Sequence, residues 1–248
     1  MLFALHCQDE LIILVDAPHL AYSPTKDLFK TMSKHPRTGC KEGSVGHAWI
    51  CLVRDGVVIL EGGHSGERGI SQPRYFDGVF QAVWQGKKNP VRYLWAVQND
   101  GFFQNGSGGH VPSIAAKVVI SSDVFDAIYR FVMTYPFRRY ALLGPQCCRF
   151  VIEVAKLAGL ELKAALSIPI DRCIVLDGRQ IQLWHDARFS TLVCETPDVL
   201  EVSLKKAIKE GRALDATLWY FKYCKAPKPL IKTVLSFPRR YSRYLTFP

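Results

Sequence analysis

Gly46-His-Ala-Trp-Ile-Cys-Leu-Val-Arg-Asp-Gly-Val-Val-Ile-Leu-Glu61 contains the clearest hairpin signal in this sequence. Two runs of apolar, largely β-prone residues, 47–53 and 57–61, flank the dipeptide Asp55-Gly56. Asp-Gly between two such runs is a strong turn signal, because both central residues of the tight hairpin turn need a positive φ. The stretch therefore predicts an antiparallel hairpin.

The same turn predicts which residues face each other across the hairpin. A two-residue turn places Glu61 opposite Ile50 and His64 opposite His47. Both Glu61 and His64 are therefore candidates to orient an imidazole at position 47.

Outside the hairpin, hydrophobic spacing predicts elements of both types. The segment 122–133 has a serine at its start and apolar residues three or four positions apart, which is typical of one helical face. Further strands are expected at 11–15, 91–97, 171–176 and 179–184, further helices at 26–33, 147–158 and 197–210, and long loops at 62–90 and 98–113.

Length and composition favour one large domain with an appendage. The chain has 248 residues, of which 48% are hydrophobic and 22% charged, so it contains enough apolar residues for a sizeable core. We expect a domain at 1–224 and a tail at 225–248. The expected fold class is α+β, with an antiparallel sheet that contains the 46–61 hairpin and packs against the helix that begins at Cys147.

The tail carries most of the chain's excess positive charge. The net charge is +10, and residues 225–248 contribute six cations and no acid, interleaved with apolar and aromatic residues. This composition suits an anionic membrane surface or an acidic partner, and the alternative is a solvated C-terminal extension. Four prolines in the tail argue against a continuous helix.

Several functional classes lack their sequence signals. No stretch is long and apolar enough for a membrane-spanning helix, and residues 1–10 do not resemble a signal peptide. The phosphate-loop, zincin and serine-hydrolase motifs are absent, as is any specific sign of nucleic-acid binding. The eight cysteines include no C-x-x-C pair, so we expect no metal, no cofactor and a reducing, cytoplasmic location.

Cys147 and His47 are the residues best suited to take part in catalysis. Cys147 follows Gly144-Pro-Gln146 at the start of a predicted helix, where free N–H groups and the helix dipole favour a thiolate. Cys148 points about 100° away around that helix, so only one of the two thiols faces a site. His47 opens an apolar strand, as expected of a general base. The alternative interpretation is a pair of buried structural thiols.

Two segments resemble a known family. Tyr140-Ala-Leu-Leu-Gly-Pro-Gln-Cys-Cys-Arg-Phe-Val151 is similar to the Y-x-L-L-x-x-N-C-x-x-F-V stretch of the lecithin:retinol acyltransferase group. The 46–61 hairpin resembles the H-x-G-I-Y-V-G-D-G-x-V-I-E strand pair of the circularly permuted papain-like (NlpC-type) cysteine hydrolases. The order of histidine, third polar residue and cysteine along the chain is the permuted one.

This resemblance implies roles for particular residues. It implies Cys147 as nucleophile, His47 as general base and Glu61 as the residue that orients His47. We expect His64, Tyr140, Gln146 and Trp49 to bind the substrate or support the site. Cys148 falls outside the motif. Gln146 stands where the family usually has asparagine, and Trp49 where it usually has a small residue.

The implied reaction is acyl transfer through a thioester on Cys147. With water as acceptor the protein is a peptidase or amidase, and with an amine or alcohol it is an acyltransferase. The expected substrates are peptides, amides or acyl-lipids. The alternatives are a lipid acyltransferase or thioesterase that docks peripherally on a membrane through the tail, and a binding module that uses the same cleft without chemistry.

Overall fold

An antiparallel sheet forms the centre of the protein in the computed structural model, which describes residues 8–33, 43–66, 75–176 and 178–225. The fold class is mixed α+β, as expected. The strand order is β12-β6-β1-β2-β3-β5. These strands are β1 (Asp9–Asp16), β2 (His47–Arg54), β3 (Val57–Ser65), β5 (Phe102–Asn105), β6 (Ile114–Ile120) and β12 (Leu214–Asp215).

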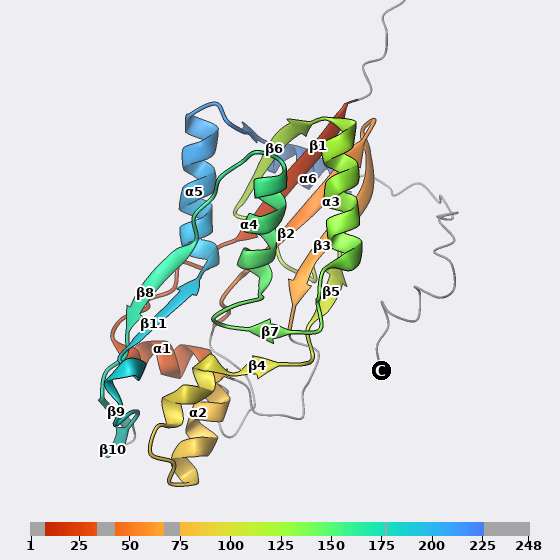
Figure 1. The fold of residues 1–248 in the computed structure, drawn as a ribbon. Helices are drawn as coiled ribbons and strands as arrows, with labels where there is room; N and C mark the ends of the chain where they lie inside the picture. Colours follow the sequence, from red (N-terminus) through yellow and green to blue (C-terminus); the bar gives the residue numbers. More distant parts are fainter. Residues whose placement is uncertain (1–7, 34–42, 67–74, 177, 226–248) are drawn as a thin grey trace, which may run out of the picture.

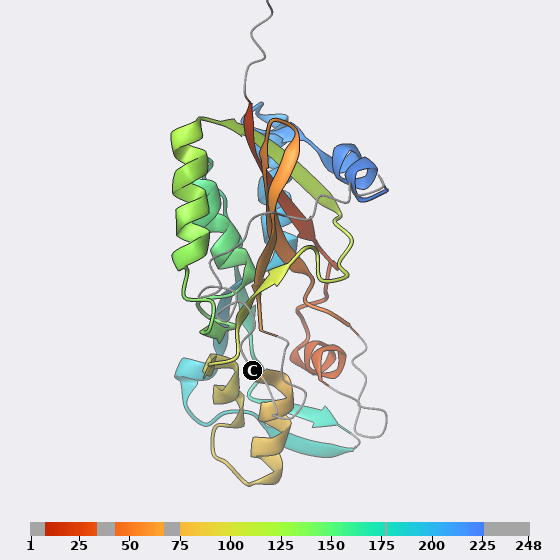
Figure 2. The same cartoon turned by 90° about the vertical axis from the view of Figure 1, so that its right-hand side faces the viewer.

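Helices cover both faces of this sheet (Figures 1 and 2). On one face lie α3 (Ser122–Thr134), α4 (Cys147–Leu157) and α5 (Pro197–Lys209), and on the other lies α6 (Thr217–Lys225). Because successive strand residues point to opposite faces, Leu11 and Ile13 pack under α4 and α5 while Ile12 and Leu14 pack toward α6. Coverage of both faces explains why the central strands are continuously apolar.

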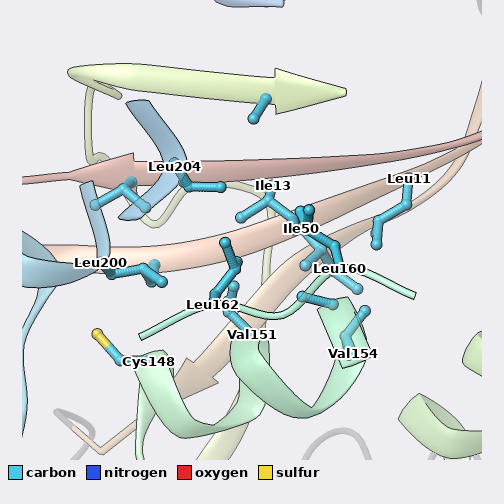
Figure 3. Packing of buried hydrophobic residues seen from close by; sticks show 14 of the residues in the cluster. Leu11, Ile13, Ile50, Cys148, Val151, Val154, Leu160, Leu162, Leu200 and Leu204 are labelled. Atoms are coloured by element: carbon cyan, nitrogen blue, oxygen red, sulfur yellow. The ribbon is translucent and has the colours of Figure 1, made fainter. Parts of the chain in front are cut away.

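The core between α4 and the sheet holds the N-terminal end of that helix in place. Val151 and Val154 of α4 face Ile13 and Ile50 of the strands, and Cys148 lies at the start of the same helical face (Figure 3). Burying each aliphatic side chain of this kind stabilises the fold by roughly 1.5–3 kcal/mol. Core packing therefore also fixes the position of Cys147, which comes immediately before Cys148 in the chain.

Below the sheet in Figure 1 lies a second group of elements, here called the lower lobe. Its apolar cluster includes Phe29, Phe76, Leu94 and Leu183. The lobe comprises α1 (Thr25–Met32), α2 (Tyr75–Trp84), the 3-10 helices η1 (Pro90–Trp95) and η2 (Ala187–Phe189), the pair β8 (Ala165–Pro169) and β11 (Thr191–Glu195), and the pair β9 (Cys173–Leu176) and β10 (Arg179–Gln182). β4 (Val97–Gln98) pairs with β7 (Tyr140–Ala141) between the lobe and the sheet.

Most predicted elements are confirmed, and the exceptions have physical causes. The strand expected at 91–97 is wrong, because Pro90 starts a 3-10 helix in which Val91 and Leu94, three positions apart, are both buried. The loops expected at 62–90 and 98–113 contain the end of β3, all of α2 and β5. Lys225, expected to begin the tail, ends α6, and residues 226–248 lie outside the described part of the chain.

The hairpin is confirmed, but its predicted register is wrong. Asp55 and Gly56 have φ values of 53° and 74°, as the tight turn requires. An irregularity in the β2–β3 pairing between Leu52 and Val53 then shifts the register, so that Glu61 faces Cys51 instead of Ile50. The side chain of Glu61 therefore points to the α6 face of the sheet.

Candidate active site

Cys147 is the first residue of α4 and lies where β3 separates from β2. Pairing between these strands ends at Ile50 and Gly62, and beyond that point β3 pairs with β5. The Ala48 N–H consequently donates a hydrogen bond to the Cys147 sulfur. Cys147 as a residue is 4% exposed, so its side chain lies inside the protein, at the opening between the two strands.

The surroundings of Cys147 favour its thiolate. Hydrogen bonds from the Cys148 thiol and the His47 imidazole, the nearby charge of His47 and the Ala48 N–H hold the pKa of Cys147 well below its usual range, although burial opposes this. A thiolate is the nucleophilic form of cysteine, so the site supplies the first requirement of covalent catalysis.

Cys148 behaves in the opposite way. It is fully buried in the core, and burial together with its hydrogen bond to Cys147 raises its pKa well above the usual range. Its thiol therefore stays protonated and acts as a donor to its neighbour.

His47 opens β2 and lies beside the Cys147 thiol. Gly46 makes this placement possible: its φ is 75°, and a Cβ there would come within 2.1 Å of the Asp16 carbonyl oxygen. The His47 ring stacks on Trp49, with 5.8 Å between centroids, so Trp49 supports the imidazole from within the sheet face. The His47 Nε2 atom is buried and has no hydrogen-bond partner among the described residues.

His64, near the end of β3, joins this group. It is fully buried, and its Nε2–H donates to the Phe137 carbonyl oxygen at 2.8 Å. Burial lowers the pKa of His64 to about 4, while the charges of Cys147 and His47 act on it in opposite directions. The imidazole is therefore neutral at pH 7, and its Nδ1 carries a lone pair with no hydrogen-bond partner in the described part of the chain.

Tyr140 belongs to the aromatic surroundings of His64. The two rings meet edge to face, with 5.0 Å between centroids, and Tyr135 and Phe137 make similar contacts. Tyr140 is placed by the short pairing of β7 with β4. This arrangement holds the His64 ring in one orientation.

Glu61 is not brought to this group. It faces Cys51, four residues along β2 from His47, which corresponds to about 13 Å of strand. Its Oε1 accepts a hydrogen bond of 2.6 Å from the Tyr220 hydroxyl of α6. The carboxylate thus links α6 to the sheet through this hydrogen bond. Its position does not support the orienting role that the resemblance implies.

Gln146 caps α4 and links it to β11. Its Oε1 accepts from the Cys148 N–H at 2.8 Å and from the Cys147 thiol at 3.4 Å, while its Nε2 donates to the Glu195 carbonyl oxygen at 2.8 Å. One backbone N–H at the start of α4 is therefore already paired with the Gln146 side chain. Arg149 forms an ion pair with Glu195, while burial raises the pKa of that carboxyl group.

Sequence reasoning missed two residues on the outer side of His47. The His110 ring stacks on that of His47, with 4.9 Å between centroids, and His110 Nδ1 lies 2.7 Å from Asp16 Oδ2. Asp16 is the cross-strand partner of His47. The one sequence signal for His110 is its place after Gly108-Gly109 in a predicted loop, which does not reveal the contact.

Within the described residues, no group of three or more His, Cys, Asp or Glu side chains is arranged to hold a metal ion. None of the described helices combines the length and hydropathy needed to cross a membrane. No protein-family model, curated protein or solved structure matches this chain.

Proposed function

We propose that this protein is a cysteine-dependent hydrolase, a peptidase or amidase with a permuted papain-like fold of the NlpC type. The observation that carries the proposal is the convergence of three groups where β2 and β3 separate: the acidified Cys147 thiol, the His47 imidazole and the neutral His64 imidazole. A nucleophile at a helix start beside a histidine on a strand is the arrangement that covalent acyl transfer requires.

In the proposed reaction, the Cys147 thiolate attacks the substrate carbonyl carbon and forms a carbon–sulfur bond. Protonated His47 then gives its proton to the leaving amine as the carbon–nitrogen bond breaks, which leaves a thioester. Next, His47 removes a proton from water, and the resulting hydroxide attacks the thioester. The acid product departs, and Cys147 is again a thiolate beside protonated His47.

His64 replaces Glu61 as the proposed orienting residue. Its Nε2–H is committed to the Phe137 carbonyl, so only Nδ1 is able to accept a hydrogen bond. In the described residues neither this Nδ1 nor His47 Nε2 has a hydrogen-bond partner, and we propose that the two pair during the reaction, as the third member of a catalytic triad pairs with its histidine. His64 is neutral, so it orients His47 without adding a negative charge.

The proposal is tested by trapping the acyl-enzyme. The full chain is incubated with a chromogenic ester and a matching amide, quenched in acid and mapped by mass spectrometry. We expect an acyl group on Cys147 that hydroxylamine removes, together with product release. Cys147→Ala abolishes both signals. Cys51→Ala, which removes a buried thiol on the α6 face, retains them. Turnover that survives in Cys147→Ala refutes the proposal.

A second candidate is acyl transfer at a membrane surface, which the composition of the tail favours. Residues 226–248 contain five cations and no acid, interleaved with apolar residues. In this case the same Cys147 thioester is resolved by an amine or alcohol, and the acyl donor is a lipid. Product analysis with added glycine ester or glycerol distinguishes transfer from hydrolysis.

A further inference from the structure

The lower lobe contains a pocket that is separate from the Cys147 group. Its volume is about 970 Å³, within the range of pockets that hold small organic ligands. It is lined by the segment 87–89, by η1 and by η2. Cys147, His47 and His64 do not line it, so the cavity is distinct from the proposed hydrolase site.

The pocket is positively charged. Lys87, Lys88, Arg92 and Arg188 line it, and no carboxylate does so in the described ranges. Arg188 forms an ion pair with Asp186 through Nε at 2.7 Å, but its side chain is 73% exposed, and a guanidinium has further N–H donors on its two terminal nitrogens. Four cations around one cavity favour a ligand with more than one negative charge.

The pocket also presents aromatic surface. Tyr93, Trp95 and Phe189 line it, and the rings of Trp95 and Phe189 meet edge to face with 5.2 Å between centroids. The Arg188 guanidinium carbon lies 4.9 Å from the centre of the Phe189 ring. Trp95 and Tyr93 are only half-buried, which leaves part of each ring for a planar ligand to contact.

The walls of the pocket are fixed relative to one another. Asn89 Oδ1, before η1, accepts hydrogen bonds from the backbone N–H groups of His185 and Asp186, before η2, at 2.8 and 3.1 Å. The Val91 N–H donates to the Leu183 carbonyl oxygen at 3.1 Å. The backbone segments that carry the cations and the rings are therefore fixed relative to one another, which lowers the entropic cost of binding.

The geometry points to a binding site for a nucleoside polyphosphate, with the base against Trp95 and the phosphates on Arg92, Arg188 and the two lysines. A planar base and a phosphate chain in one molecule match the aromatic and the cationic parts together. Inorganic phosphate would leave the rings unused, and an uncharged aromatic compound would leave the cations unused.

Calorimetric titration of the full chain with ADP, adenosine, pyrophosphate and a short oligoadenylate tests this site. We expect ADP to bind at one site per chain, and adenosine and pyrophosphate to bind at least about fivefold more weakly, since each lacks one part of the ligand. Trp95→Leu should weaken ADP binding by at least about fivefold and leave pyrophosphate binding unchanged. Arg92→Gln should weaken both by roughly tenfold.

Two control variants test whether loss of any tryptophan or any cation, outside the pocket, also weakens ADP binding. Trp84→Leu removes an exposed tryptophan that does not line the pocket, and Lys209→Gln removes a cation from α5, so both should bind ADP normally. Arg92→Gln changes an exposed side chain, so this variant tests the site even if Trp95→Leu fails to fold. Equal affinity for ADP and pyrophosphate overturns the proposal, as does ADP binding that Arg92→Gln does not change. Oligoadenylate binding more than tenfold tighter than ADP identifies a nucleic-acid strand as the ligand instead.

Discussion

The Nε2 atom of His64 lies 2.8 Å from the backbone carbonyl oxygen of Phe137. A carbonyl oxygen only accepts hydrogen bonds, so this contact requires a proton on Nε2 and leaves a lone pair on Nδ1. The backbone of one loop thereby selects the tautomer of a histidine that lies 73 residues away in the sequence.

Replacement of His64 should affect turnover far more than replacement of Glu61. We expect His64→Ala to reduce kcat/KM by about 10²-fold, because His47 then loses the group proposed to orient it. Glu61→Gln retains an oxygen that accepts from Tyr220 and lies far from Cys147, so its kcat/KM should stay within about twofold. Steady-state kinetics on both variants would falsify this assignment if Glu61→Gln showed the larger loss.

Alkylation should distinguish the two adjacent cysteines. Because its pKa is lowered, Cys147 should react with iodoacetamide near pH 6, whereas Cys148, with a raised pKa, should not. Cys148→Ala removes the main hydrogen bond to the thiolate and should slow labelling of Cys147 roughly tenfold at pH 6, but little at pH 9. Cys148→Ser retains a donor and serves as the control. Peptide mapping that finds the label on Cys148 contradicts this prediction.

Burial of His64 should make folding stability depend on pH. The pKa of His64 is about 4 in the folded protein and 6.5 ordinarily. Between pH 6.5 and about pH 4 the unfolded chain therefore binds a proton at this residue that the folded protein does not bind. Stability contributed by the neutral imidazole is complete above pH 6.5 and is lost as pH falls toward 4, by about 3 kcal/mol in total.

Urea unfolding at several pH values between 4 and 7 measures this effect. His64→Gln keeps a donor for the Phe137 carbonyl but has no titrating group, so its stability should fall less over the same range. Parallel curves for the two proteins would show that other groups cause the pH dependence.

Removal of residues 226–248 should separate membrane binding from chemistry. Because α6 ends at Lys225, a chain ending there retains every described element and should fold and label at Cys147 as the full chain does. It should lose binding to anionic vesicles at low salt, since about 1 kcal/mol per tail cation is removed. Replacement of the five tail cations by glutamine in the full chain tests charge alone. Vesicle binding that persists in both proteins places the membrane contact elsewhere.

The sequence alone determined the local parts of this protein. The Asp55-Gly56 turn predicted the hairpin because its φ values depend on the two residues themselves. Hydrophobic spacing predicted α3, α4 and α5, and hence the position of Cys147 at a helix start, because helical periodicity repeats within a few residues.

Which side chains meet depends on the folding of the whole chain. The pairing irregularity between Leu52 and Val53 moved Glu61 to the α6 face, where Tyr220, distant by 159 residues, binds it. The placement of His64 among aromatic rings likewise depends on chain segments that are remote in sequence. Strand register and contacts of this kind are set by packing across the whole sheet, and no local pattern encodes them.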